Sequence, residues 1–108
     1  MSDTRISAII CTHNRDNYLG AAIDSLLEQD CSIDFEVLVI DNASSDRTRA
    51  VVEERLNHPR LKYIYESTVG LSVARNTGAQ NSSGEIIAYL DDDAVASKAW
   101  LQTLYSAF

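Results

Sequence analysis

The chain has 108 residues, 45% of them hydrophobic, and a formal net charge of -7. This length suits one small domain with a single core, and the hydrophobic content excludes a disordered chain. The acidic balance argues against a nucleic-acid-binding surface, which needs basic stripes, and no apolar run is long enough to span a bilayer.

Residues 1–5 are polar and lack the pattern of a signal peptide, so a cytoplasmic location is expected. Cys11 stands in an apolar run and resembles a small buried hydrophobe, whereas Cys31 stands in a loop. The two cysteines lie too far apart in sequence for a zinc-binding CxxC pair. We expect two free thiols in a reducing compartment.

The first half of the chain alternates between strand and helix patterns. Residues 6–11 are apolar and β-branched, which predicts a buried strand, and a polar turn follows over 12–16. Apolar residues then recur at helical spacing from Tyr18 to a predicted end near Gln29. Residues 35–40 predict a second buried strand that ends on Asp41.

The second half repeats this alternation. The turn over 42–46 leads to a helix that carries Ala50, Val51, Val52 and Leu56 and stops before Pro59. Residues 61–65 favour a third strand at a sheet edge. A helix over 71–81, with Ser72 as its cap, precedes a fourth strand over 85–90. Ser97 is the expected cap of a last helix that carries Trp100 and Tyr105 as core residues.

Strands that alternate with helices predict an α/β fold with a mostly parallel sheet of about four strands, in one domain over residues 1–108. The last helical pattern runs to Phe108 without a C-terminal cap. We therefore expect a truncated domain, although a naturally short protein has the same pattern. An exposed sheet edge favours self-association into a homo-oligomer.

Polar residues follow three of the predicted strands, at residues 12–15, 41–45 and 91–93. Ligands of open parallel sheets bind outside the carboxyl ends of the strands, so these clusters belong at one edge. His13 is expected to be an ordinary turn residue and His58 a loop residue. The acidic charge would suit a diphosphate ligand only if a divalent cation stood between them.

Asp91, Asp92 and Asp93 are the most specific feature. Adjacent carboxylates repel one another unless they are solvated or neutralised. Asp91 and Asp93 would face one ligand and a metal ion, with Asp92 facing away; an acidic turn that caps the next helix is the alternative. Asp41 suits either a ligand N–H or the capping of its own turn, and Arg75 suits either a diphosphate or a surface ion pair.

Four motifs, in order, resemble the N-terminal half of the inverting family-two glycosyltransferases, which include cellulose, chitin and hyaluronan synthases. They are IICTHNR at 9–15, VIDNASSD at 39–46, GLSVARNTG at 70–78 and YLDDD at 89–93. The resemblance covers nearly the whole chain. It implies the Rossmann-like GT-A fold of nucleotide-diphospho-sugar transferases and a role in polysaccharide biosynthesis.

The resemblance also implies residue roles for a donor, with a UDP-sugar expected. Thr12 and Asn14 match the base pocket, Asp41 the carboxylate that reads the nucleobase, and Arg75 the basic residue near the diphosphate.

In the Asp-X-Asp motif of the family, Asp91 matches the residue on ribose and Asp93 the ligand of Mn or Mg. The metal would stabilise the leaving nucleoside diphosphate in a single displacement with inversion at the anomeric carbon.

The catalytic base of the family is expected beyond Phe108, as are the elements that bind a glycan, lipid or protein acceptor. This chain alone should bind nucleotide weakly and transfer no sugar. Any association with the inner face of the membrane would come from segments outside these residues.

Three other functions compete with this interpretation. A receiver domain of a signalling relay would need acidic residues after strand one and a phospho-acceptor Asp after strand three, but Glu66 and Ser67 stand there. A two-metal phosphatase or nucleotidyltransferase would need further carboxylates facing the aspartate triplet. A noncatalytic nucleotide-binding module is the third alternative.

Overall fold

The computed structural model describes residues 4–108, in which strands and helices alternate along the chain. The strands are β1 (Ile6–Thr12), β2 (Phe35–Asn42), β3 (Leu61–Glu66) and β4 (Ile86–Tyr89). The helices are α1 (Asp16–Leu27), α2 (Thr48–Glu53), α3 (Leu71–Asn81) and α4 (Trp100–Ser106).

All strand pairs in the sheet are parallel, in the order β3-β2-β1-β4. The predicted α/β fold with a parallel sheet of four strands is therefore confirmed, as is the edge position of β3. β1 and β2 run in register from Ile6 opposite Phe35 to Thr12 opposite Asp41. Their carboxyl ends therefore stop side by side, which is where the polar clusters were expected.

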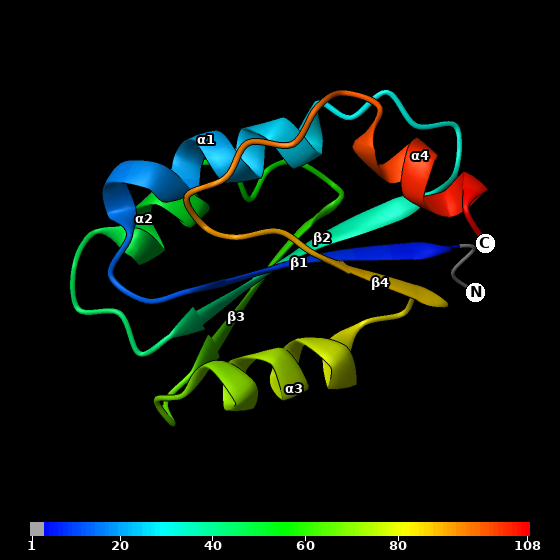
Figure 1. The fold of residues 1–108 in the computed structure, drawn as a ribbon. Helices are drawn as coiled ribbons and strands as arrows, with labels where there is room; N and C mark the ends of the chain where they lie inside the picture. Colours follow the sequence, from blue (N-terminus) through cyan, green and yellow to red (C-terminus); the bar gives the residue numbers. More distant parts are fainter. Residues whose placement is uncertain (1–3) are drawn as a thin grey trace.

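One face of the sheet carries the larger core. Side chains alternate along a strand, so Ile6, Ala8 and Ile10 of β1 point to this face. There they pack with apolar residues of α1, α2 and α4, which lie together on one side of the sheet in Figure 1. Trp100 and Tyr105 are partly buried against this cluster, as predicted.

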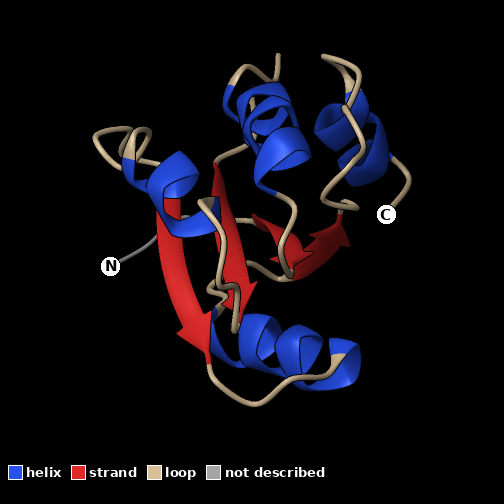
Figure 2. Ribbon diagram, turned by 90° about the vertical axis from the view of Figure 1, so that its left-hand side faces the viewer, coloured by secondary structure: helices blue, strands red, loops and turns tan. Residues whose placement is uncertain are grey.

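Helix α3 covers the opposite face by itself (Figure 2). Its Ala74 is buried against Ile9, Leu38 and Ile40 of the two central strands. A Cβ at Gly78 would lie 2.9 Å from Ile9 Cγ2, so the missing side chain allows α3 to approach the sheet closely. This close packing brings the first turn of α3 to the carboxyl ends of β1 and β2.

Several local predictions were wrong. The second helix ends at Glu53, and Leu56 lies beyond it with 40% exposure. Tyr18 is 54% exposed because it sits on the solvent side of α1, although its spacing matches the apolar stripe.

The two predicted serine caps were also wrong. Gly70 is the N-cap of α3 and Ala99 that of α4, and neither makes a side-chain cap hydrogen bond. Ser97 contributes its backbone carbonyl instead, which accepts from Trp100 N. The conformation of the preceding loop decides where each of these helices starts. Residue propensities alone do not predict that conformation.

Within residues 4–108, no helix combines the length and apolar character that membrane crossing requires. Both cysteines are free thiols, as expected. Cys11 is only partly buried, because it stands where β1 reaches a cavity.

Candidate functional site

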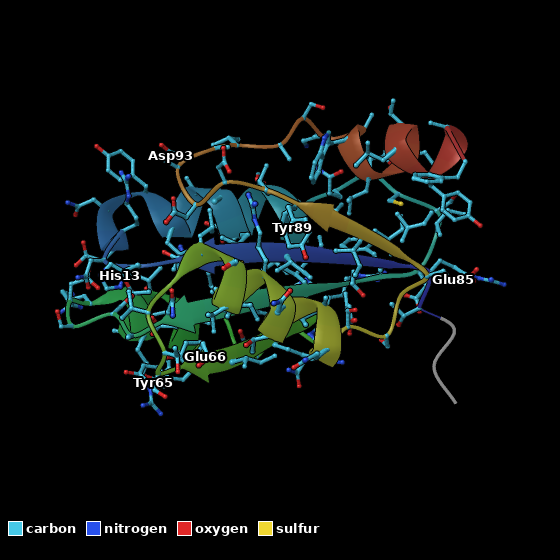
Figure 3. The ribbon with its side chains drawn as sticks, turned by 60° about the horizontal axis from the view of Figure 1, so that its bottom comes forward. His13, Tyr65, Glu66, Glu85, Tyr89 and Asp93 are labelled. Carbon is cyan, nitrogen blue, oxygen red and sulfur yellow. The ribbon has the colours of Figure 1, made fainter. Side chains whose placement is uncertain are left out.

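A cavity of roughly 500 Å³ opens at the carboxyl edge of the sheet. That volume is in the range of small-molecule sites. Figure 3 shows His13, Glu66 and Asp93 toward this end of the molecule and Glu85 at the other end. The lining residues come from the ends of three strands and the start of α3: Cys11, Thr12, His13, Arg15, Asn42, Val69, Gly70, Leu71, Ala74, Arg75, Tyr89, Leu90, Asp91, Asp92 and Asp93.

Thr12 contributes a polar atom that the fold leaves unsatisfied. The residue is 2% exposed, and its Oγ1 is the single buried side-chain nitrogen or oxygen within residues 4–108 that has no hydrogen-bond partner. A buried hydroxyl without a partner is unfavourable by about 1–3 kcal/mol. Thr12 lines the cavity but its Oγ1 is shielded from solvent, so a bound ligand could supply the missing bond only after a small movement of this side chain or its neighbours.

Arg75 stands on the first turns of α3, with its guanidinium 5.6 Å from the centre of the Tyr89 ring. The Tyr89 hydroxyl donates to the Arg75 carbonyl at 3.3 Å. Arg15 lines the same cavity. No ion pair between residues 4 and 108 engages either arginine, so both cations are available to an anionic ligand.

The three aspartates follow β4, which ends at Tyr89, and all three line the cavity. The expectation that Asp92 faces away is therefore wrong. The alternation of a strand does not continue past its end, and here a turn begins, in which Ala94 N donates to the Asp91 carbonyl at 3.1 Å. The pKa of the Cys11 thiol is raised, chiefly by burial; the charge of Arg75 lowers it and that of Asp92 raises it. Both charges therefore lie close enough to affect Cys11 at the cavity wall.

The donor set suits a hard divalent cation that shares its coordination with a ligand. Among residues 4–108, no three His, Cys, Asp or Glu side chains gather closely enough to hold a metal by themselves. Mg²⁺ commonly binds through one or two carboxylates together with substrate phosphates and waters. Asp91 and Asp93, on the wall of an open cavity, fit that mode.

Asp41 lies beside the cavity, outside the lining residues that the described chain supplies. It is 1% exposed, and it accepts hydrogen bonds from Ser44 N at 3.1 Å and from the Tyr63 hydroxyl at 2.6 Å. Burial, this bond and the Asp41 charge raise the pKa of Tyr63, which keeps its hydroxyl a donor. The turn-capping alternative for Asp41 is therefore realised, and its orientation is held from two sides.

Asn14 also lies outside the lining residues and joins two loops instead. It adopts a positive φ of 52°, accepts from Ser45 N at 2.8 Å through Oδ1, and donates from its backbone N to Ser44 Oγ at 2.9 Å. His13 donates from Nδ1 to the Asn42 carbonyl at 2.6 Å. These bonds fix the β1–α1 loop against the β2–α2 loop.

Thr12, Arg75, Asp91 and Asp93 are thus brought together, while Asn14 and Asp41 support the site from behind. Sequence reasoning did not single out Arg15, Asn42 or Tyr89 as parts of one cavity. Arg15 and Asn42 lie in polar clusters already noted, but the contribution of Tyr89 depends on the packing of α3 beside β4.

Comparisons with known proteins agree with this geometry. The profile described as "Glycosyl transferase family 2" matches residues 7–108. The chain is 33% identical over 105 residues to glycosyltransferase GlyA of Streptococcus pneumoniae, covering 95% of this chain and 15% of that protein. It is 36% identical to validoxylamine A glucosyltransferase of Streptomyces hygroscopicus subsp. limoneus, covering 94% of this chain and 23% of that enzyme.

Solved structures show the same architecture. TarS 1-349 of S. aureus superposes with a TM-score of 0.87 and 30% identity, covering 95% of this chain and 32% of that one. The mannosyltransferase PcManGT of Pyrobaculum calidifontis, in complex with GDP-Man and Mn2+, superposes with a TM-score of 0.79 and 28% identity, covering 94% and 33%. The predicted GT-A fold is confirmed.

The chain spans about a quarter or less of these two curated relatives and about a third of these two solved chains. Within that span the profile match, the identities and the fold agree. The chain belongs to glycosyl transferase family 2.

Proposed function

We propose that this chain is the donor-binding part of a glycosyltransferase that takes a sugar from a nucleoside diphosphate and passes it, with inversion, to a glycan, lipid or protein acceptor. The observation that carries the proposal is the cavity itself. Around one space it joins three carboxylates with a buried hydroxyl and two arginines for which residues 4–108 supply no hydrogen-bond or ion-pair partner, respectively. Such a mixture of charges suits a metal-bound diphosphate.

In this proposal Thr12 binds the nucleoside directly, while Asn14 and Asp41 define the base-binding wall through the loops they hold. Arg75 faces the diphosphate and Asp91 the ribose. Asp93 would hold Mn or Mg, which as a Lewis acid stabilises the departing nucleoside diphosphate.

A UDP-sugar is the proposed donor. TarS 1-349 has been solved in complex with UDP and with UDP-GlcNAc, and PcManGT with GDP-Man, so both bases occur among structural neighbours. The two free thiols suit the proposed cytoplasmic location. A role in polysaccharide biosynthesis is proposed from the family resemblance. The catalytic base is proposed to lie outside these residues, so the 108-residue chain should transfer no sugar.

A calorimetric titration with UDP, GDP and TDP, each with and without Mn²⁺, tests the proposal. We expect the tightest binding for UDP with Mn²⁺, and a loss of about tenfold or more in Asp93→Ala because the metal bridge is lost. Asp30→Ala is the matched control, since Asp30 is exposed and lies outside the cavity. Equal metal-free binding by wild type and Asp93→Ala would refute the metal role.

The two-metal alternative is less well supported. It needs further carboxylates opposite the aspartate triplet, and no cluster of three potential metal ligands occurs across residues 4–108. Asp41 is already held by Ser44 and Tyr63. A noncatalytic nucleotide-binding module would share the binding behaviour, and sugar transfer by the complete protein separates it from the enzyme.

A further inference from the structure

Asn42 is the last residue of β2, and its side chain ties that strand to the loop before α3. It is 5% exposed. Its Nδ2 donates to the Glu66 carbonyl at 3.2 Å and to the Thr68 carbonyl at 2.8 Å, and its Oδ1 accepts from Gly70 N at 3.0 Å. Both amide hydrogens and one lone pair are therefore used within a segment of five residues.

That segment sets the start of α3. Gly70 is the N-cap, with a φ of 152° that disfavours other residues, and it has no side chain with which to cap the helix. The side chain of Glu66 adds a second tie, since it accepts from Thr68 N at 3.0 Å and from Thr77 Oγ1 at 2.5 Å. The first turn of α3 is thus placed by Asn42 and Glu66.

Arg75 depends on this placement. It stands about one helical turn past Leu71, the first residue of α3, and Ala74 N donates to the Gly70 carbonyl at 3.0 Å. Gly70, Leu71 and Arg75 all line the cavity. A shift of the segment over 66–70 would therefore move the guanidinium relative to Thr12 and the aspartates across the cavity.

The bond pattern demands an amide at position 42. An aspartate has almost the same shape, but its ionised carboxylate cannot donate to the two carbonyls that Nδ2 serves. An alanine would leave all three backbone groups of the segment without this partner. The Asn42 side chain directs its polar atoms to the segment over 66–70. Most of its hydrogen-bonding capacity is therefore already used before a ligand enters the cavity.

We propose that Asn42 is a positioning residue of the donor cavity, whose side-chain amide holds residues 66–70 and thereby sets Arg75 against the diphosphate. This inference rests on the proposed function of the cavity. It differs from the roles implied by the family motifs because Asn42, although it lines the cavity, acts through Arg75 with side-chain amide hydrogens that are already used within the protein.

A double-mutant cycle on UDP affinity, measured with Mn²⁺ by calorimetry or NMR titration, tests the inference. Asn42→Ala should weaken binding about tenfold in the wild-type background, but less than about threefold in the Arg75→Met background, because residues that act through each other are not additive. Asn81→Ala is the matched control: Asn81 lies in the last turn of α3, donates to the Thr77 carbonyl, and lies outside the cavity. It should leave UDP affinity unchanged.

A ligand-free measurement separates this inference from the proposed function. Hydrogen exchange at Gly70 N should quicken at least about tenfold in Asn42→Ala, with β1 and β2 amides unchanged. Asn42→Ser, whose hydroxyl can replace at most one of the two bonds from Nδ2, serves in the double-mutant cycle if the alanine variant unfolds. Because serine could still accept from Gly70 N, it does not serve for the exchange measurement. Additive losses in the cycle, or unchanged exchange at Gly70, would overturn the role of Asn42. If wild type binds no nucleotide, the proposed function fails, and the exchange result still decides whether Asn42 holds the segment.

Discussion

The two ends of the sheet treat buried polar groups in opposite ways. At the amino end, Glu36 of β2 has a side chain only 5% exposed, yet four donors reach it. Ser7 Oγ lies at 2.6 Å, Lys62 Nζ at 2.7 Å, and Ser83 donates from N at 2.7 Å and from Oγ at 2.9 Å. This carboxylate ties together three strands and the α3–β4 loop.

At the carboxyl end, Asp41 and Asn42 are also bonded, but other groups that line the cavity have no partner in the described chain. Thr12 Oγ1 is buried and unpaired, and no ion pair in the described chain neutralises Asp91, Asp92 or Asp93. At the amino end, the hydrogen bonds to Glu36 stabilise the fold. At the carboxyl end, the side chains without partners are left for a ligand. The contrast predicts that substitutions at the amino end change stability, and that those at the carboxyl end change binding.

Loss of the Glu36 carboxylate should have the largest effect. Glu36→Ala removes the acceptor shared by Ser7, Lys62 and Ser83 and should lower the free energy of unfolding by about 3 kcal/mol. Urea denaturation measures it. Glu85→Ala is the control, because the Glu85 side chain is 70% exposed and its pair with Arg5 should contribute less than about 1 kcal/mol. Similar losses in both variants would contradict the contrast.

Stability should also depend on pH through Glu36. Burial alone would raise its pKa, but the hydrogen bonds from Lys62, Ser7 and Ser83 outweigh burial and bring the pKa below the ordinary value of 4.5. A group with a lowered folded pKa stabilises the protein above its unfolded pKa, and this contribution is lost as pH falls through the folded pKa. The stability difference between wild type and Glu36→Gln should therefore shrink below about pH 4.5. A difference that is constant from neutral pH down to acid would sink this assignment.

Thr12→Val should separate stability from binding. The substitution replaces an unpaired hydroxyl by a methyl of similar size, so the protein should become more stable by about 1 kcal/mol. Affinity for UDP should fall at the same time, because the bond that the ligand completes is lost. Thermal unfolding and calorimetry check the two parts. A destabilised variant with full affinity would show that Thr12 serves the fold.

The smallest effect is expected at Asp92. Asp92→Asn removes one of three neighbouring charges on the cavity wall and should stabilise the protein by roughly 0.5 kcal/mol at low salt. The gain should disappear at high salt, since it arises from repulsion between the half-buried Asp92 and its two exposed neighbours. Urea denaturation at two salt concentrations measures the effect, and a gain that persists at high salt would point to packing instead.

The fold could be predicted from the sequence because its signals are local and agree with one another. The apolar stretches that begin at Ile6 and Phe35 are short and rich in β-branched residues, which predicts buried strands, and the helical patterns between them predict parallel connections. Parallel strands share one carboxyl edge, so the sequence assigns Thr12 and the aspartates to one site, whereas only the family resemblance assigns Arg75 to it.

The tertiary structure decided which of those side chains are free. Asp41 and Asn14 belong to the family motifs, as Thr12 does, yet Tyr63 holds Asp41 and Ser45 holds Asn14 through bonds that span more than twenty residues of sequence. Asp92 lines the cavity beside Asp91 and Asp93 because strand alternation ends with β4 at Tyr89, and Asn42 reaches across to Gly70. Sequence patterns determine which faces are apolar and where strands end. Whether a polar atom has a hydrogen-bond partner depends on its neighbours in space. This difference distinguishes residues that hold the loops of the site from residues that remain free for the proposed donor.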